Sequence, residues 1–380
     1  MAGSAENAPT WRSSFPAMGT RVDIIGWGGD GMAIVNAVVG IVARHEDMWS
    51  VFRPSSEVSQ LNAAVRDAAI GDGASRCGAD SAHGGPGLVV SEETDRLLRD
   101  ALALAEATGG TFNPLIGPLV AAWDVKAMRA AYVAGVPLPP APATDAVEAA
   151  SRASSWGFLS RVGEQRWAMG VPAESVGGVD VASPRLDLGG IAKGYTADAC
   201  RDLAVSMGAR GVLVSVGTSS VSVFGTRADG SSWRAGLRDP HGGPTSVAGV
   251  VELPAGGMSS LSTSGDNLGP LGGVGVGCAA ERAAESTSDR RARETPRETS
   301  VGGGRVFDHH IIDPRTGYPA HAGVRQVSVV ASSGVLAEAL STALLVEPSI
   351  DVPDVVARWA RVTGAPASAK VVGLVRAAQG

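Results

Sequence analysis

Residues 185–225 decide the fold and read RLDLGGIAKGYTADACRDLAVSMGARGVLVSVGTSSVSVFG. The first four residues alternate in polarity, which predicts a short strand, and Gly189–Gly190 predicts a turn after it. The residues that follow, as far as Ala209, predict a helix. Residues 210–225 are rich in valine and interrupted by small residues, which predicts a pair of strands. A helix therefore stands between extended segments at the centre of the chain.

Strands and helices also flank this stretch on both sides. Alternating polarity predicts a first strand at 20–27, and Ser91 is the expected N-cap of a helix that ends before Gly109–Gly110. Further expected elements are a helix at 31–47, strands at 233–240 and 324–331, and a helix at 334–346. These elements alternate without a strict strand–helix–strand rhythm and without a repeat of fixed period. We therefore expect an α+β fold.

Composition marks off the segments between these elements. We expect one domain over residues 15–350, with the remainder in loops or at its ends. The expected irregular segments are a flexible N-terminus at 1–14, a surface loop at 66–87, a stiff linker from Pro137 to Pro142, a disordered insertion at 267–305 and a partly helical tail at 351–380. For residues 279–293 within the insertion, a solvated helix is the alternative.

The overall charge and the cysteines argue against several classes of protein. The 380 residues carry a net charge of −6, and no run of Lys and Arg is long enough to follow a phosphate backbone, which argues against nucleic acid as a partner. Cys77, Cys200 and Cys278 are far apart and odd in number, so they fit neither a zinc pattern nor a disulfide framework. With no apolar leader, lipid-anchor cysteine or membrane span, we expect a cytoplasmic protein.

Four short clusters carry groups that are suited to chemistry, and the first is DLGGIAKGY at 187–195. Two glycines between a strand and a helix can aim unpaired backbone N–H groups and the positive end of the helix at a phosphate, and Lys193 adds a cation. The spacing matches neither the Walker A motif nor the dinucleotide fingerprint. A purely structural strand–turn–helix is therefore the alternative interpretation.

The other three clusters lie further along the chain, and each also has a structural interpretation. STSGD at 262–266 offers small hydroxyls and a glycine that can approach a ligand, or forms a plain turn. In HHIIDPRTG at 309–317, Arg315 would pair with Asp313 to hold a tight turn, and His310 is either structural or a general base. In EALST at 338–342, Glu338 and Thr342 lie one helical turn apart and, with a backbone carbonyl, could hold a hard cation; a half-buried helix with a polar edge is the alternative.

Together with three further blocks, these clusters resemble the ApbE family of Mg-dependent FAD:protein FMN transferases. The further blocks are MGTRVDI at 18–24, MWSVFRPSSEVSQLN at 48–62 and TGGTFNPLIGPLVAAW at 108–123, and ALSTALLV at 339–346 extends the last cluster. All seven blocks follow the family's order, from about Met18 to Val346. The resemblance implies a T-fold-like arrangement of mixed sheets and packed helices in one compact, two-lobed domain.

The resemblance also implies a reaction and the residues that carry it. FAD binds with Mg²⁺, or Mn²⁺ in its place, its pyrophosphate is split, AMP leaves, and FMN is joined to a Ser or Thr hydroxyl of an acceptor flavoprotein. His310 would be the acid or base, with Lys193 and Asp187 as further catalytic candidates, while His309 is expected to be structural. The metal would be held by the Ala192 carbonyl, the Glu338 carboxylate and the Thr342 hydroxyl. FAD would contact Met18, Phe52, Thr111, Phe112, Asn113, Gly189, Tyr195, Ser264, Gly265 and Ile312.

Three positions depart from the family pattern. The family usually has Asp where this chain has Glu338 and Asn113, and it has Gly-Gly-Asp where residues 217–220 read GTSS. The longer side chain at 338 matters because Mg²⁺ favours near-ideal octahedral geometry at about 2.0–2.1 Å. Three functions therefore stay open, namely FMN transfer to a protein, hydrolysis of FAD to FMN and AMP, and flavin binding without catalysis.

Overall fold

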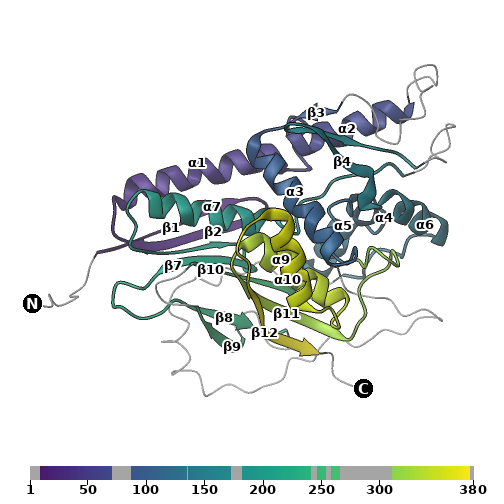
Figure 1. Cartoon of the computed structure of the whole chain (residues 1–380). Helices are drawn as coiled ribbons and strands as arrows, with labels where there is room; N and C mark the ends of the chain where they lie inside the picture. Colours follow the sequence, from purple (N-terminus) through teal and green to yellow (C-terminus); the bar gives the residue numbers. More distant parts are fainter. Residues whose placement is uncertain are drawn as a thin grey trace, which may run out of the picture.

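A seven-stranded sheet forms the centre of the fold. In a computed structural model, the chain is described over residues 9–70, 87–134, 136–172, 182–240, 246–253, 258–265 and 310–376 (Figure 1). The strand order is β1-β2-β6-β7-β10-β11-β12, and every neighbouring pair is antiparallel. The strands are β1 Thr10–Ala17, β2 Thr20–Trp27, β6 Gly211–Val216, β7 Ser220–Gly225, β10 Met258–Gly265, β11 Val324–Ala331 and β12 Ala369–Arg376.

The two faces of this sheet are covered by different elements. On one face, Val22 of β2 and Val214 of β6 pack with residues of α1 (Gly31–Trp49) and α7 (Ala192–Ser206). On the other face, Leu213 of β6 packs with the two-stranded hairpin of β8 (Arg234–Arg238) and β9 (Val247–Glu252). Figure 1 shows α1 and α7 side by side along the sheet, with β8 and β9 across it. β6 is therefore buried on both sides, as its unbroken valine-rich sequence requires.

Helices and a small sheet build a second lobe around the same core. A three-stranded sheet has the order β3-β5-β4, with β3 Leu88–Val89, β4 Leu159–Gly163 and β5 Arg166–Met169. The helices are α2 Glu57–Ile70, α3 Glu92–Ala107, α4 Gly117–Ala122, α5 Val125–Ala134, α6 Thr144–Ala153 and a 3₁₀ turn at Trp156–Phe158. One hydrophobic cluster joins α2, α3 and β5 of this lobe to α9 (Gly334–Val346) and α10 (Val352–Thr363). The two lobes therefore share a core.

The α+β class is confirmed, and so are most of the expected elements. The expected helix beginning at Ser91 is α3, with the Ser91 hydroxyl accepting a hydrogen bond from the Thr94 N–H at 3.2 Å. The hairpin expected at 210–225 is β6 and β7. The strand expected at 185–188 is wrong, because its backbone bonds to segments that are not strands. The Asp187 N–H donates to the Pro114 carbonyl, and the Leu186 N–H donates to the Asn62 side chain.

The expected ends of the domain need correction. β1 begins at Thr10, inside the expected flexible N-terminus, because Trp11 and Phe15 at alternate positions pack against the core beneath α1. The tail expected to be only partly helical contains α10 and also β12, which completes one edge of the large sheet. The loop expected from residue 66 starts later, because alanine-rich α2 continues to Ile70. The insertion expected at 267–305, including the alternative helix at 279–293, lies outside the described residues.

No helix among the described residues combines the length and the apolar character that crossing a bilayer requires.

Candidate active site

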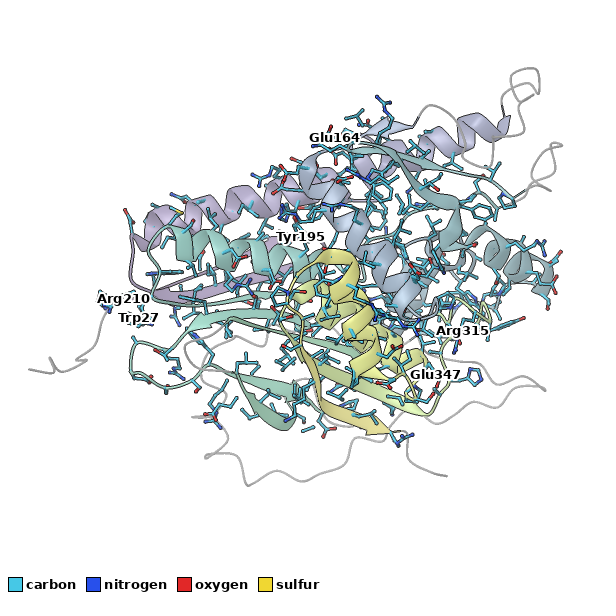
Figure 2. All side chains as sticks on the ribbon, viewed as in Figure 1. Trp27, Glu164, Tyr195, Arg210, Arg315 and Glu347 are labelled. Atoms are coloured by element: carbon cyan, nitrogen blue, oxygen red, sulfur yellow. The ribbon has the colours of Figure 1, made fainter. Side chains whose placement is uncertain are left out.

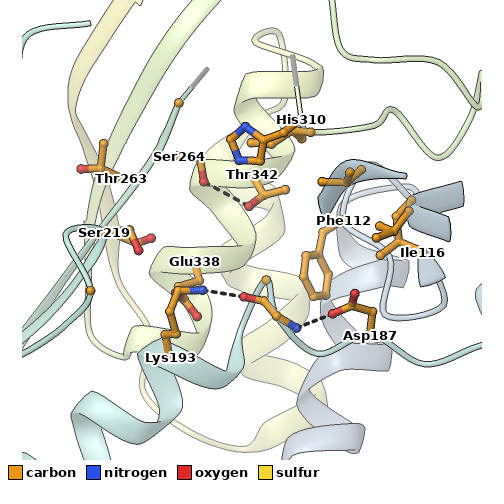
Figure 3. Close-up of a pocket in the computed structure, with 18 of the residues that line it drawn as sticks. Phe112, Ile116, Asp187, Lys193, Ser219, Thr263, Ser264, His310, Glu338 and Thr342 are labelled. Carbon is orange, nitrogen blue, oxygen red and sulfur yellow. Dashed lines mark hydrogen bonds and ion pairs between the residues drawn. The ribbon is translucent and has the colours of Figure 1, made fainter. Parts of the chain in front are cut away.

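A cavity of about 470 Å³ opens between the large sheet and the second lobe. Its wall combines the β1–β2 turn, the segment before α4, the glycine turn before α7, the ends of β7 and β10, the stretch at 310–314 and one face of α9. Figure 3 shows Lys193, His310 and Phe112 entering this space from three different segments. Of the residues expected at the site, the cavity brings together Met18, Thr111, Phe112, Asn113, Asp187, Gly189, Lys193, Ser264, Gly265, His310, Ile312, Glu338 and Thr342.

The glycine turn before α7 holds its own backbone tightly. The Gly189 N–H donates to Asp187 Oδ1 at 2.9 Å, and the N–H groups of Ile191 and Ala192 both donate to the Leu188 carbonyl. Lys193 Nζ folds back onto the Gly189 carbonyl at 2.6 Å (Figure 3). The expectation of a row of unpaired N–H groups is therefore wrong for these residues, because turn formation uses them. The cation of Lys193 and the Asp187 carboxylate remain on the cavity wall.

Glu338 is the buried acid of the site, with 4% of its surface exposed. Its carboxylate accepts hydrogen bonds from the Gly194 N–H at 2.8 Å and from Ser220 Oγ at 2.5 Å. Lys193 Nζ lies 3.7 Å from the same carboxylate. These contacts fix the Glu338 side chain between α7 and α9, on the wall of the cavity.

Two glycines bring the elements that carry these groups into direct contact. A Cβ atom on Gly194 of α7 would lie 2.4 Å from the Gly334 carbonyl oxygen at the start of α9, and a Cβ atom on Gly334 would lie 2.3 Å from the Gly194 carbonyl oxygen. Only glycine permits this backbone-to-backbone approach. The approach places the Gly194 N–H within reach of Glu338, one turn further along α9.

Small hydroxyls line the side of α9 that faces β10. Ser264 Oγ lies 3.1 Å from Thr342 Oγ1 and 2.8 Å from Ser341 Oγ. Glu338 and Thr342 thus both reach the cavity, as their spacing of four residues predicts. The STSGD cluster is strand rather than turn as far as Gly265, and its serine at 264 contacts the helix.

A braced turn carries His310 at the cavity wall. The Arg315 guanidinium forms two hydrogen bonds with the Asp313 carboxylate, at 3.1 and 3.0 Å, which confirms the expected pair. Arg315 also lies 3.4 Å from Glu347 at the end of α9 (Figure 2), and Trp123 donates its indole N–H to the Gly317 carbonyl at 2.8 Å. The turn is thereby tied to both lobes, so the position of His310 depends on both.

An apolar wall faces these polar groups. Phe112, Ile116 and Ile312 line it, and Asn113 holds the chain beside them by donating to the Ser154 carbonyl and accepting from the Leu115 N–H. Met18 adds a further apolar side chain from the two-residue β1–β2 turn, where its φ angle is +52°. A non-glycine residue in this left-handed conformation is uncommon, and such residues are frequent at ligand sites. One side of the cavity therefore suits a flat apolar ring.

Three expected site residues do not line this cavity. Phe52 is 77% exposed and borders a second cavity of about 950 Å³, with Lys126 Nζ 5.4 Å from its ring centre. Tyr195 packs edge-on against Trp49 and His45 beneath α3 (Figure 2), and burial raises the pKa of its hydroxyl. The Ala192 carbonyl accepts a hydrogen bond from Thr196 Oγ1 at 2.7 Å.

Several residues at the site carry no signal in the sequence. Ser220 contacts Glu338 across 118 positions of the chain, and Arg238 and Gln326 line the cavity from β8 and β11. His45 supports α7 from behind, with Nδ1 2.9 Å from Thr196 Oγ1, and burial lowers its pKa to about 4. Only the tertiary pairing of strands and helices brings these side chains to the site.

The donor set of the cavity suits a hard cation. No group of three or more His, Cys, Asp and Glu side chains suited to a metal occurs in the part of the chain that the structure describes. The oxygens on offer are the Glu338 carboxylate, the Thr342 hydroxyl and backbone carbonyls, which is the oxygen chemistry that Mg²⁺ accepts and zinc rarely does.

The sequence pattern of the ApbE family matches residues 18–269 and 296–363. The chain belongs to the ApbE family. The FAD:protein FMN transferase of Treponema pallidum is 32% identical over 322 residues, which are 83% of this chain and 71% of that protein. The FAD:protein FMN transferase of Rhodobacter capsulatus is 29% identical over 92% of this chain, which spans 54% of that protein. The crystal structure of the ApbE protein of Thermotoga maritima has the same fold, with a TM-score of 0.63, 24% identity and 97% of both chains covered.

Proposed function

We propose that this ApbE-family chain transfers FMN from FAD to a Ser or Thr hydroxyl of an acceptor protein, with release of AMP and with Mg²⁺ as cofactor. The observation that carries the proposal is the buried Glu338 carboxylate, held between α7 and α9 on a cavity that also contains His310, Lys193 and Thr342. The similarity to the FAD:protein FMN transferase of Treponema pallidum supports the same activity.

The residues of the cavity divide into three roles. The apolar wall of Phe112, Ile116 and Ile312 would hold the flavin ring, and Lys193 would neutralise phosphate charge. Glu338 and Thr342, which both line the cavity, would hold Mg²⁺ or Mn²⁺. The bound ion would supply charge stabilisation to the splitting pyrophosphate.

The transfer step needs a base and a leaving group. His310 accepts the proton of the acceptor hydroxyl, whose oxygen forms a bond to the phosphorus of the FMN half of FAD. The bond between that phosphorus and the bridging oxygen breaks, and AMP leaves with the bridging oxygen. Water in place of the hydroxyl would give hydrolysis of FAD to FMN and AMP. An acceptor segment that excludes water from the cavity would therefore favour transfer over hydrolysis.

Incubation with FAD and a flavin-acceptor protein tests this proposal. Parallel reactions contain Mg²⁺, Mn²⁺ or a chelator, and denaturing gels are read by flavin fluorescence. We expect a fluorescent acceptor band with either metal, no band with the chelator, and no band with an acceptor whose target Ser or Thr is replaced by Ala. Release of AMP without a band would identify an FAD pyrophosphatase instead, and FAD binding without AMP would identify a non-catalytic flavin protein.

A further inference from the structure

Arg238 is a cation of the cavity wall whose buried Nε atom has no hydrogen-bond partner among the residues that the structure describes. It lies on β8 and lines the cavity together with Thr263 and Gln326. In the described part of the chain, no acceptor lies within hydrogen-bond reach of this nitrogen. The Arg238 backbone, in contrast, is fixed, because its carbonyl accepts a hydrogen bond from Gln326 Nε2 at 2.9 Å.

Two arginines elsewhere in the described chain are paired with carboxylates. Arg201 is bonded to Asp198 at 2.9 Å and to Asp202 at 2.8 Å, and Arg161 is bonded to Asp95 at 2.7 Å. A buried guanidinium nitrogen without a partner is costly and therefore uncommon. The missing partner of Arg238 is accordingly expected to be an anion that enters the cavity from outside.

The acids of the cavity are already engaged elsewhere. Glu338 is bonded to Gly194 and Ser220 and lies beside Lys193, and Asp187 accepts from the Gly189 N–H. The cavity residues contributed by the end of β10 are neutral, namely Ser262, Thr263, Ser264 and Gly265. Arg238 and Lys193 therefore offer positive charge from two different elements, β8 and α7.

We propose that Arg238 binds a phosphate group of the dinucleotide substrate, and that it is a phosphate-binding residue in addition to Lys193. A guanidinium presents several N–H donors in a planar fork, which matches two oxygens of one phosphate. The proposal rests on the proposed function, because it takes FAD as the ligand of this cavity. Gln326 holds the β8 backbone so that the fork faces the cavity.

Titrations of FAD and of riboflavin, which has no phosphate, test this role. Flavin fluorescence is measured for the wild type, Arg238→Gln, Arg238→Lys and the control Arg234→Gln, whose arginine lies on the same strand but does not line the cavity. We expect Arg238→Gln to weaken FAD binding about tenfold or more and to leave riboflavin binding unchanged. The FAD affinity of Arg238→Lys should lie between those of the wild type and Arg238→Gln, since lysine keeps the positive charge but cannot form two parallel hydrogen bonds to one phosphate.

The outcomes separate this proposal from the function on which it rests. Equal FAD affinity in the wild type and Arg238→Gln would overturn the role of Arg238, and so would an equal loss for FAD and riboflavin. A raised KM for the acceptor with unchanged FAD affinity would assign the guanidinium to the acceptor protein and also overturn it. A wild type that binds no FAD would contradict the proposed function itself. If Arg238→Gln does not fold, the FAD and riboflavin affinities of Arg238→Lys are compared with those of the wild type instead.

Discussion

At the scale of single residues, the contact between Glu338 and Ser220 shapes the site. Glu338 is buried on α9, and Ser220 is the first residue of β7. The two side chains form a hydrogen bond of 2.5 Å. The Ser220 hydroxyl therefore fixes one oxygen of the Glu338 carboxylate, while the Gly194 N–H fixes the other.

His310→Ala is expected to lower the rate of flavin transfer by about 10²–10⁴-fold, because the acceptor hydroxyl loses its general base. Binding of FAD should change little, since the apolar wall and the cations of the cavity remain. Single-turnover transfer and fluorescence titration of FAD measure the two quantities. His321→Ala is the matched control, because that imidazole lies on the same stretch and does not line the cavity. Equal transfer rates in the His310 variant and the wild type would contradict the proposal that His310 is the general base.

At the scale of elements, the crossing of α7 and α9 organises the site. The two helices meet through Gly194 and Gly334, and the Gly194 N–H bonds to Glu338. Asp198 strengthens the same junction, since it accepts hydrogen bonds from Ser222, Ser260 and the Gly334 N–H. Any displacement of α7 relative to α9 therefore changes the distance between Lys193 and Glu338.

Gly194→Ala tests this crossing. The added methyl group would meet the Gly334 backbone, so we expect a loss of unfolding free energy of about 1–3 kcal/mol and a loss of transfer activity. Gly40→Ala is the control, because Gly40 lies within α1 with open space around it and should gain about 0.5–1 kcal/mol. Denaturant unfolding measures both changes. A Gly194→Ala variant as stable and active as the wild type would show that the close approach is dispensable.

Local sequence patterns predict the secondary-structure elements better than they predict the tertiary contacts between them. The helix at α9 and the shared face of Glu338 and Thr342 follow from spacing alone, and the Asp313–Arg315 pair follows from two residues of one turn. Ser220, Arg238 and Gln326 could not be predicted, because they reach the cavity only through tertiary contacts: Ser220 bonds to Glu338 118 positions away, and Gln326 bonds to Arg238 88 positions away. Tyr195 was expected at the flavin, but it lies about 100° around α7 from Gly194 and packs against His45 and Trp49.

At the scale of the whole molecule, the C-terminal residues complete the sheet and the shared core. β12 pairs with β11, and α10 buries Val355 and Trp359 in the cluster that contains α9. Burying each such side chain contributes roughly 1.5–3 kcal/mol, against a net stability of roughly 5–15 kcal/mol for a typical protein. β11 and α3 therefore depend on residues beyond position 350 for part of their packing.

A chain that ends at residue 350 is expected to lose cooperative thermal unfolding, because β11 loses a neighbouring strand and α3 loses the helix that packs against it. A chain that ends at residue 376 keeps α10 and β12 and should unfold as the full chain does. Circular dichroism with heating compares the two. A cooperative transition in the shorter chain, at the temperature of the full chain, would show that the domain ends before α10.

The most direct test of FMN transfer at the α7–α9 junction is the parallel measurement, by mass spectrometry, of AMP and of FMN-bearing acceptor in one reaction with Mg²⁺. The wild type is predicted to form the two products in equal amounts. Glu338→Gln is predicted to form both at least about 100-fold more slowly, because a neutral amide is a poor ligand for a hard cation, while the surface control Glu106→Gln matches the wild type. AMP without modified acceptor in the wild type, or an unchanged rate in Glu338→Gln, would contradict this account.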